Sequence, residues 1–124
     1  MYEFPSLDEI EVALSEIIDD IPKAFFDELN GGIVLLDNFK MHPESKPGKP
    51  LYIMGEYVID RLGRQIKIYY GSFKKVHYGL TLEKLRTLLK KTLIHEFVHH
   101  LEGRAGLKGL EVEDANYLKQ YLEN

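Results

Sequence analysis

The chain has 124 residues, of which 44% are hydrophobic and 29% charged, which is typical of one globular domain (residues 1–124) with a single core. A formal net charge of −4 argues against general nucleic-acid or anionic-membrane binding, and no apolar run approaches the roughly 20 residues that cross a bilayer. Disulfides and thiolate ligands are excluded because there is no cysteine, and no secretory signal pattern opens the chain, so we expect a cytoplasmic location.

The N-terminal part predicts an N-terminal helix, a helical turn and a strand. Ser6 and Glu9 have the spacing of a capping box at a helix start. The apolar residues that follow share one helix face: Ile10, Leu14, Ile17, Ile18 and Ile21. Pro22 opens a short helical turn over residues 24–29. Residues 33–36, Ile-Val-Leu-Leu between turn residues, predict a short buried strand.

The middle of the chain predicts a loop followed by a β-hairpin. Residues 38–50 contain three prolines and one glycine, which predicts a loop and a candidate mobile rim. Residues 51–59 and 64–70 are rich in aromatic and β-branched side chains and predict strands joined by a turn at 60–63. With the strand at 33–36 they make a small three-stranded sheet, so the expected fold class is α+β.

A long amphipathic helix is predicted over residues 81–102. Thr81 is a suitable N-cap, and Glu83 places an acidic group in the first turn. Gly103 and Gly106 are stop signals at the far end. Residues at three- and four-residue steps define the helical period: Leu82, Leu85, Leu88, Leu89, Thr92, Phe97, Val98 and Leu101.

This helix carries the most specific motif of the chain, His95-Glu96-Phe97-Val98-His99. Histidines four residues apart on a helix face the same way, and two imidazoles supply two of the nitrogen ligands that Zn²⁺ takes. Glu96 would then reach a zinc-bound water as general base. His95 and His99 continue the stripe of Leu88 and Thr92, so they should point inward or into the floor of a cleft.

A catalytic zinc ion needs a third protein ligand, and a short C-terminal helix predicted over 111–123 offers acidic candidates. Glu111 and Asp114 fall within its apolar arc, whereas Glu113 falls outside it. A carboxylate on a buried face is costly unless it is paired or bound to metal. This favours Glu111 or Asp114 as the third ligand, with the choice between them open. Each acid alone is explained equally well as a partner of the helix N-terminus.

The remaining histidines have simpler interpretations. His42 in the proline-rich loop and His77 between predicted elements are typical solvated loop histidines. Either would become a ligand if the zinc site were structural, because such a site needs four protein ligands. His100 lies about 100° around the helix from His99, which suits packing or a contact behind the ligands.

Three segments together resemble the small bacterial zincin-like metallopeptidase family. They are Leu-Tyr-Ile-Met-Gly-Glu-Tyr at 51–57, Ile-Lys-Ile-Tyr-Tyr-Gly at 66–71 and His-Glu-Phe-Val-His-His at 95–100. The resemblance implies a minimal zincin fold, with His95 and His99 as metal ligands and Glu96 as catalytic base. This chain departs from the family pattern at residues 104–109, an extra stretch before the acidic residues that leaves the third ligand undetermined.

The expected function is therefore zinc-dependent hydrolysis of a peptide or protein substrate, with one Zn²⁺ per chain and Glu96 as general base. In zincins generally, a substrate adds as an extra strand to an edge strand above the helix. Any of the three strands could be that edge. The alternative is a zincin-fold binding module with little or no activity, since a minimal fold has few elements to build specificity pockets.

Overall fold

The computed structural model describes residues 4–105, and the predicted helix 111–123 lies outside them. These residues form an α+β fold, as predicted. The elements in chain order are helix α1 (Leu7–Asp19), 3₁₀ helix η1 (Lys23–Phe26), strands β1 (Gly32–Leu36), β2 (Lys40–Met41), β3 (Tyr52–Ile53), β4 (Gly55–Asp60) and β5 (Gly63–Tyr69), and helices α2 (Tyr70–Val76) and α3 (Leu82–Ala105).

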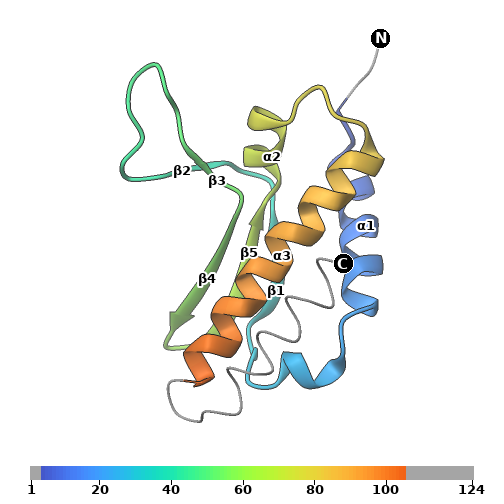
Figure 1. Cartoon of the computed structure of the whole chain (residues 1–124), viewed down its shortest axis with the longest axis vertical. Helices are drawn as coiled ribbons and strands as arrows, with labels where there is room; N and C mark the ends of the chain where they lie inside the picture. The colour runs from blue at the N-terminus through green and yellow to red at the C-terminus, as the bar shows by residue number, and fades with distance from the viewer. Residues whose placement is uncertain (1–3, 106–124) are drawn as a thin grey trace.

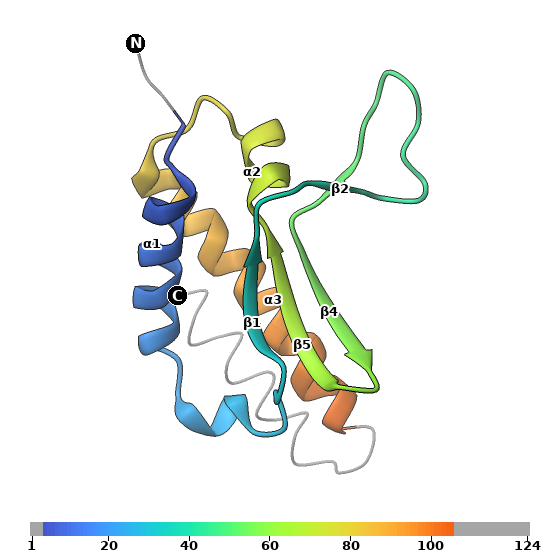
Figure 2. The ribbon, with the colours of Figure 1, turned by 180° about the vertical axis from the view of Figure 1, so that it is seen from behind.

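The three-stranded sheet has the order β1-β5-β4. β1 runs parallel to β5, with Ile33 opposite Ile66, and β4 runs antiparallel to β5, with Tyr57 opposite Ile66. Residues 37–54 connect β1 to β4, and this long connection leaves room for β5 to pair between the two strands. β4 is consequently an edge strand. Helix α3 crosses one face of this sheet, in front of it in Figure 1 and behind it in Figure 2, and α1 packs against α3 on the side of β1.

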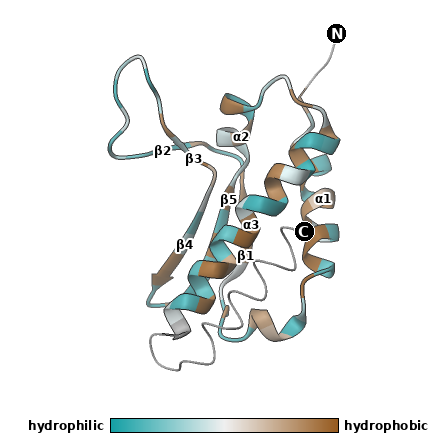
Figure 3. Ribbon diagram, viewed as in Figure 1, coloured by the Kyte–Doolittle hydropathy of each residue, from teal (hydrophilic) through white to brown (hydrophobic). Residues whose placement is uncertain are grey.

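The hydrophobic core fills the space between the sheet and these two helices. Ile66 and Ile68 of β5 are completely buried, because alternate residues of a strand share a face. The helices contribute the side chains predicted from their period: Ile10, Leu14 and Ile17 of α1, and Leu85, Leu89, Phe97 and Leu101 of α3. Hydrophobic and hydrophilic residues alternate along both helices in Figure 3, as amphipathic helices require.

The predicted helix starts are confirmed by their capping contacts. The Glu9 amide donates to Ser6 Oγ at 3.1 Å and the Ser6 amide to Glu9 Oε1 at 3.2 Å, so the capping box is complete. At α3 the Lys84 amide donates to Thr81 Oγ1 at 3.3 Å. The far end was predicted less well, because α3 continues past Gly103 to Ala105. One glycine costs a helix only about 1 kcal/mol, which packing readily offsets.

One strand prediction in the middle of the chain was wrong, and another ended one residue too late. Residues 51–59 are not one strand: Tyr52–Ile53 pairs with Lys40–Met41, whereas Gly55–Asp60 pairs with β5. The two parts therefore belong to different sheets, one paired with β2 and the other with its hairpin neighbour β5. Residues 64–70 end as a strand at Tyr69, because Tyr70 begins helix α2. Seven residues are too few to show a helical period, and burial of Phe73 holds this helix.

The predicted proline-rich loop belongs to a projecting arm, residues 38–53, which comprises β2, β3 and their connection (Figures 1 and 2). α2 holds the base of the arm. The Gly71 amide donates to the Asn38 carbonyl at 3.1 Å, and Ser72, which is fully buried, accepts from the Lys40 amide at 3.1 Å. The tip of the arm is hydrophilic and its base carries hydrophobic residues (Figure 3).

Gly55 allows β4 to approach α3 closely. A Cβ at this position would lie 2.7 Å from Thr92 Cγ2 and 3.3 Å from Glu96 Cγ. We expect Gly55→Ala to lower the free energy of unfolding by about 1–3 kcal/mol, the usual effect of overpacking, which exceeds the roughly 0.5–1 kcal/mol gained by replacing a strand glycine. Adding Thr92→Ser, which removes only Cγ2, should restore part of the loss. Urea unfolding of the two single variants and the double variant measures this, and additive effects would contradict it.

Candidate metal centre

Helix α3 presents two different faces. Leu85, Leu89 and Leu93 are completely buried against the core, whereas His95 and His99 are exposed. The two histidines line a cleft of about 680 Å³ between α3 and the edge strand β4. The sequence predicted that the two histidines face inward or into the floor of a cleft, and in the structure they face the cleft. The cleft lining is Ile53, Gly55, Glu56, Tyr57, Ile59, His95, Glu96, His99, Glu102 and Gly103.

The imidazoles of His95 and His99 converge. Their Nε2 atoms lie 3.0 Å apart, and the rings are nearly perpendicular, at 89°. Two ring nitrogens at this distance repel each other unless a proton or a cation lies between them. Two nitrogens bound to one zinc at about 2.0–2.1 Å in tetrahedral geometry lie roughly 3.3 Å apart. The donor type and the separation of the two histidines therefore fit zinc.

Glu96 lies on the cleft floor and is only 6% exposed. Burial, helped by the nearby negative charge of Glu56, raises the pKa of Glu96 to about 7, against the opposing effect of a hydrogen bond from the Tyr57 backbone. A carboxyl group with this pKa exchanges protons readily near neutral pH, which suits a general acid and base. Its burial against β4 thus gives Glu96 chemistry that an exposed glutamate lacks.

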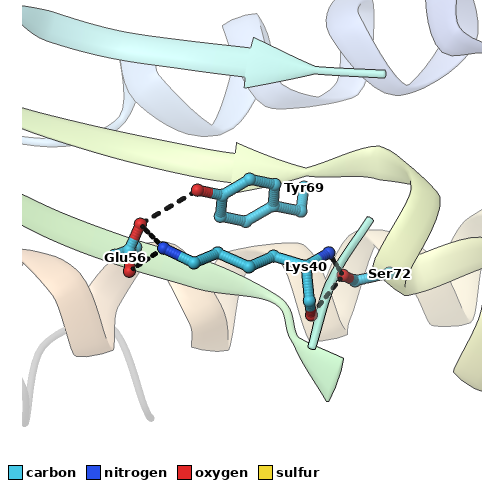
Figure 4. A network of polar contacts seen from close by, with 4 residues as sticks. All are labelled: Lys40, Glu56, Tyr69 and Ser72. Carbon is cyan, nitrogen blue, oxygen red and sulfur yellow. Dashed lines mark hydrogen bonds and ion pairs between the residues drawn. The ribbon is translucent and has the colours of Figure 1, made fainter. Parts of the chain in front are cut away.

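No sequence motif marks the polar network beside Glu96, which joins Lys40, Glu56 and Tyr69 (Figure 4). Glu56 of β4 accepts hydrogen bonds from Lys40 Nζ at 2.7 Å and from the Tyr69 hydroxyl at 2.9 Å. Burial opposes ionisation of Glu56, but these two donors lower its pKa overall. The bond to Glu56 raises the pKa of Lys40. The network fixes a negative charge at the cleft wall and ties the arm to β4.

His100 belongs to the core and not to the cleft, as its helical position predicted. It is completely buried, and its Nε2 lies 2.8 Å from the Asp27 carbonyl oxygen, which can only accept. Nε2 therefore carries a hydrogen. Nδ1 lies 2.8 Å from the Tyr57 hydroxyl, which in turn accepts from Arg64 Nη1 at 3.4 Å. These contacts connect α3 with β4 and with the segment after η1.

We expect His100→Phe to lower the free energy of unfolding by about 2–4 kcal/mol, because it removes two buried hydrogen bonds. The neighbouring variant His99→Phe is the matched control. His99 is exposed, so in metal-free protein its replacement should change stability by no more than about 0.5 kcal/mol. Urea unfolding in the presence of chelator makes the comparison, and equal losses for the two variants would contradict the assignment.

The other predicted metal ligands do not join this cleft among the described residues. Glu111 and Asp114, the candidates for the third ligand, lie outside residues 4–105. Within that range no group of three or more His, Cys, Asp or Glu side chains is close enough to hold a metal. His42 lies in the arm, where its Nδ1 accepts from the Glu44 amide at 3.0 Å. His77 follows α2, and burial lowers its pKa. A four-ligand structural site using either one is not supported.

Comparison with known proteins gives a structural relative. No family model and no curated protein matches the chain. A solved structure, described as a conserved hypothetical protein from Thermus thermophilus, is similar with a TM-score of 0.70 and 26% sequence identity, covering 83% of this chain and all of that one. The chain therefore shares its fold with a protein whose description gives no activity.

In the part of the chain that the structure describes, every helix is too short or too polar to cross a membrane.

Proposed function

We propose that this chain is a zinc-dependent metallopeptidase with a minimal zincin-like fold. The observation that carries the proposal is the convergence of His95 and His99 on an open cleft that also contains the buried carboxyl of Glu96. Two convergent imidazoles and an adjacent carboxyl of raised pKa are the parts that metal-assisted hydrolysis requires. Helical spacing and a shared N–H···N hydrogen bond also bring two imidazoles this close, so it is the carboxyl of Glu96 in the same cleft that favours metal-assisted chemistry.

Each residue of the cleft would have a distinct role in this reaction. His95 and His99 would hold Zn²⁺ through Nε2, and an acid from 111–114, Glu111 or Asp114, would complete the ligand set. When bound, zinc would supply an activated water and polarise a carbonyl oxygen. Glu96, buried beside the two histidines, would accept a proton from that water and return it to the leaving amine.

The edge strand β4 would bind the substrate backbone. Its inner edge pairs with β5, and backbone groups alternate between the two edges of a strand. Tyr57 and Ile59, which line the cleft, have their side chains on the face turned toward α3, and on the same face Gly55 lets the helix approach. A peptide that adds as a further strand to β4 would thus lie along the cleft that Glu96 and the two histidines line. The cysteine-free chain needs no oxidising compartment, so we propose the cytoplasm as the place of this activity.

The test uses the full chain purified without chelator. Zinc content is measured by mass spectrometry, and the same sample is incubated with denatured casein and with a mixed peptide library whose cleavage products are sequenced. About one zinc per chain with chelator-sensitive cleavage supports the proposal. Bound zinc without cleavage of any substrate would favour the alternative, a binding module, and failure to take up added zinc would remove the metal site altogether.

A further inference from the structure

Exposed hydrophobic side chains gather on the arm and around helix α2, outside the lining of the cleft that contains His95 and His99. Of the eight large hydrophobic side chains that are exposed among the described residues, five lie on the arm or on and just after α2: Phe39, Met41, Leu51, Val76 and Tyr78. Single exposed apolar residues are ordinary, but a cluster marks an interaction surface. This concentration therefore needs an explanation that packing of the described residues does not provide.

Six of the residues there form a continuous surface, which we name the arm–α2 surface: Phe39, Met41, Tyr52, Lys74, Lys75 and Tyr78. Met41 and Tyr52 are directly opposite each other in the β2–β3 pair, so their side chains share a face. Phe39 packs edge-on against Tyr52, with ring centroids 5.7 Å apart. A hollow of about 460 Å³ lies between Phe39, Lys74, Lys75 and Tyr78.

The surface is held in place by contacts beneath it. A Cβ on Gly71 would lie 2.6 Å from the Asn38 carbonyl carbon, so α2 and the base of the arm are in close backbone contact. The Lys40 backbone amide donates a hydrogen bond to Ser72 Oγ, and its side-chain Nζ donates one to Glu56. Lys75 Nζ lies 5.2 Å from the centre of the Phe39 ring, a cation–π contact that orients Phe39 although it is 45% exposed. A surface ordered in advance binds with a smaller entropy cost.

The charge of this region is opposite to that of the chain. The arm and α2 with the residues after it (38–53 and 70–78) contain five lysines and one acid, a net charge of +4, whereas the whole chain carries −4. The residues outside these two ranges therefore carry −8. The hollow itself is lined by two lysines and, within the described residues, by no acid. Aromatic and methionine side chains are also the types enriched in protein interfaces.

We propose that the arm–α2 surface binds an acidic polypeptide segment that also carries aromatic or aliphatic side chains. Its carboxylates would pair with Lys74 and Lys75, and its apolar side chains would cover Phe39, Met41 and Tyr78. A nucleic acid fits less well, because two lysines on a chain of net charge −4 fall short of the basic stripe that phosphate backbones require. The inference goes beyond the proposed hydrolysis and does not depend on it.

The test measures fluorescence anisotropy of a fluorescein-labelled synthetic peptide in which glutamate alternates with phenylalanine and leucine. The full chain is used as wild type and as Glu96→Gln, so that cleavage of the probe does not confuse the result. We expect saturable binding that weakens with salt. The double variant Lys74→Glu/Lys75→Glu should weaken binding at least about tenfold, as should Phe39→Ser.

The matched control is Lys84→Glu/Lys90→Glu, which changes the net charge equally on helix α3, and it should bind within about twofold of wild type. Peptides with lysine in place of glutamate, or serine in place of the apolar residues, should bind weakly or not at all. The inference is overturned if the acidic apolar peptide does not bind, if both lysine pairs weaken binding equally, or if a single-stranded oligonucleotide binds more tightly than the peptide. Because the assay measures binding and needs no cleavage, its outcome is independent of the zinc and cleavage results.

Discussion

Glu96→Gln should lower peptide hydrolysis by about 10²–10⁴-fold while zinc remains bound, since general acid–base catalysis contributes about that factor. Glutamine keeps the size of the side chain and can still accept from the Tyr57 backbone, but it cannot take up a proton. The measurement is kcat and zinc content on the same preparation, with any peptide that the wild type cleaves. Retained turnover would show that Glu96 is not the base.

Glu102→Gln is the matched control for this variant. Glu102 lines the same cleft but is exposed, so its replacement should leave kcat within about threefold of wild type. If both variants lost activity equally, loss of negative charge in the cleft, and not loss of the base, would be the cause.

Glu96→Gln should also change how the free energy of unfolding depends on pH in zinc-free protein. The folded-state pKa of Glu96, about 7, is above its unfolded value, so the folded state holds the proton more tightly. Wild type therefore loses stability as pH rises from about 4.5 through 7, whereas Glu96→Gln lacks that loss, on the order of 1–3 kcal/mol. Urea unfolding at pH 5 and pH 8 with chelator present measures the difference. An identical pH dependence in both proteins would contradict the raised pKa.

Replacing either cleft histidine should remove zinc and activity together. His95→Ala and His99→Ala each delete one of two nitrogen ligands, and we expect the zinc affinity to fall by at least about 100-fold, more than the 10–100-fold typical of residues behind the ligands. Because both side chains are exposed, the folded state should persist in each variant. Competition with a zinc-binding dye gives the affinity, and circular dichroism verifies the fold.

His42→Ala and His77→Ala remove the same side chain at positions outside the cleft and serve as controls. Both should keep the wild-type zinc affinity. Zinc loss in either one would instead indicate a structural site with a different ligand set, and unchanged affinity in His95→Ala would contradict the metal centre as described.

Local chemistry alone determined much of this protein. The capping box at Ser6, the N-cap at Thr81 and the apolar period of α3 are short-range patterns, so the two main helices could be predicted from the sequence. The four-residue spacing of His95 and His99 is a property of any helix, and it brought their Nε2 atoms together as expected. The hairpin of β4 and β5 followed from its turn residues.

The tertiary structure decided what depends on contacts between distant residues. Lys40, Glu56 and Tyr69 come from three separate strands, and no local pattern predicts that they meet. Strand pairing likewise divides residues 51–59 between two sheets and places β4 at an edge. Packing of β4 against α3 then buries Glu96, and this burial raises its pKa. Helical period and capping act within a few residues, whereas strand pairing and burial act between segments that only the folded chain brings together.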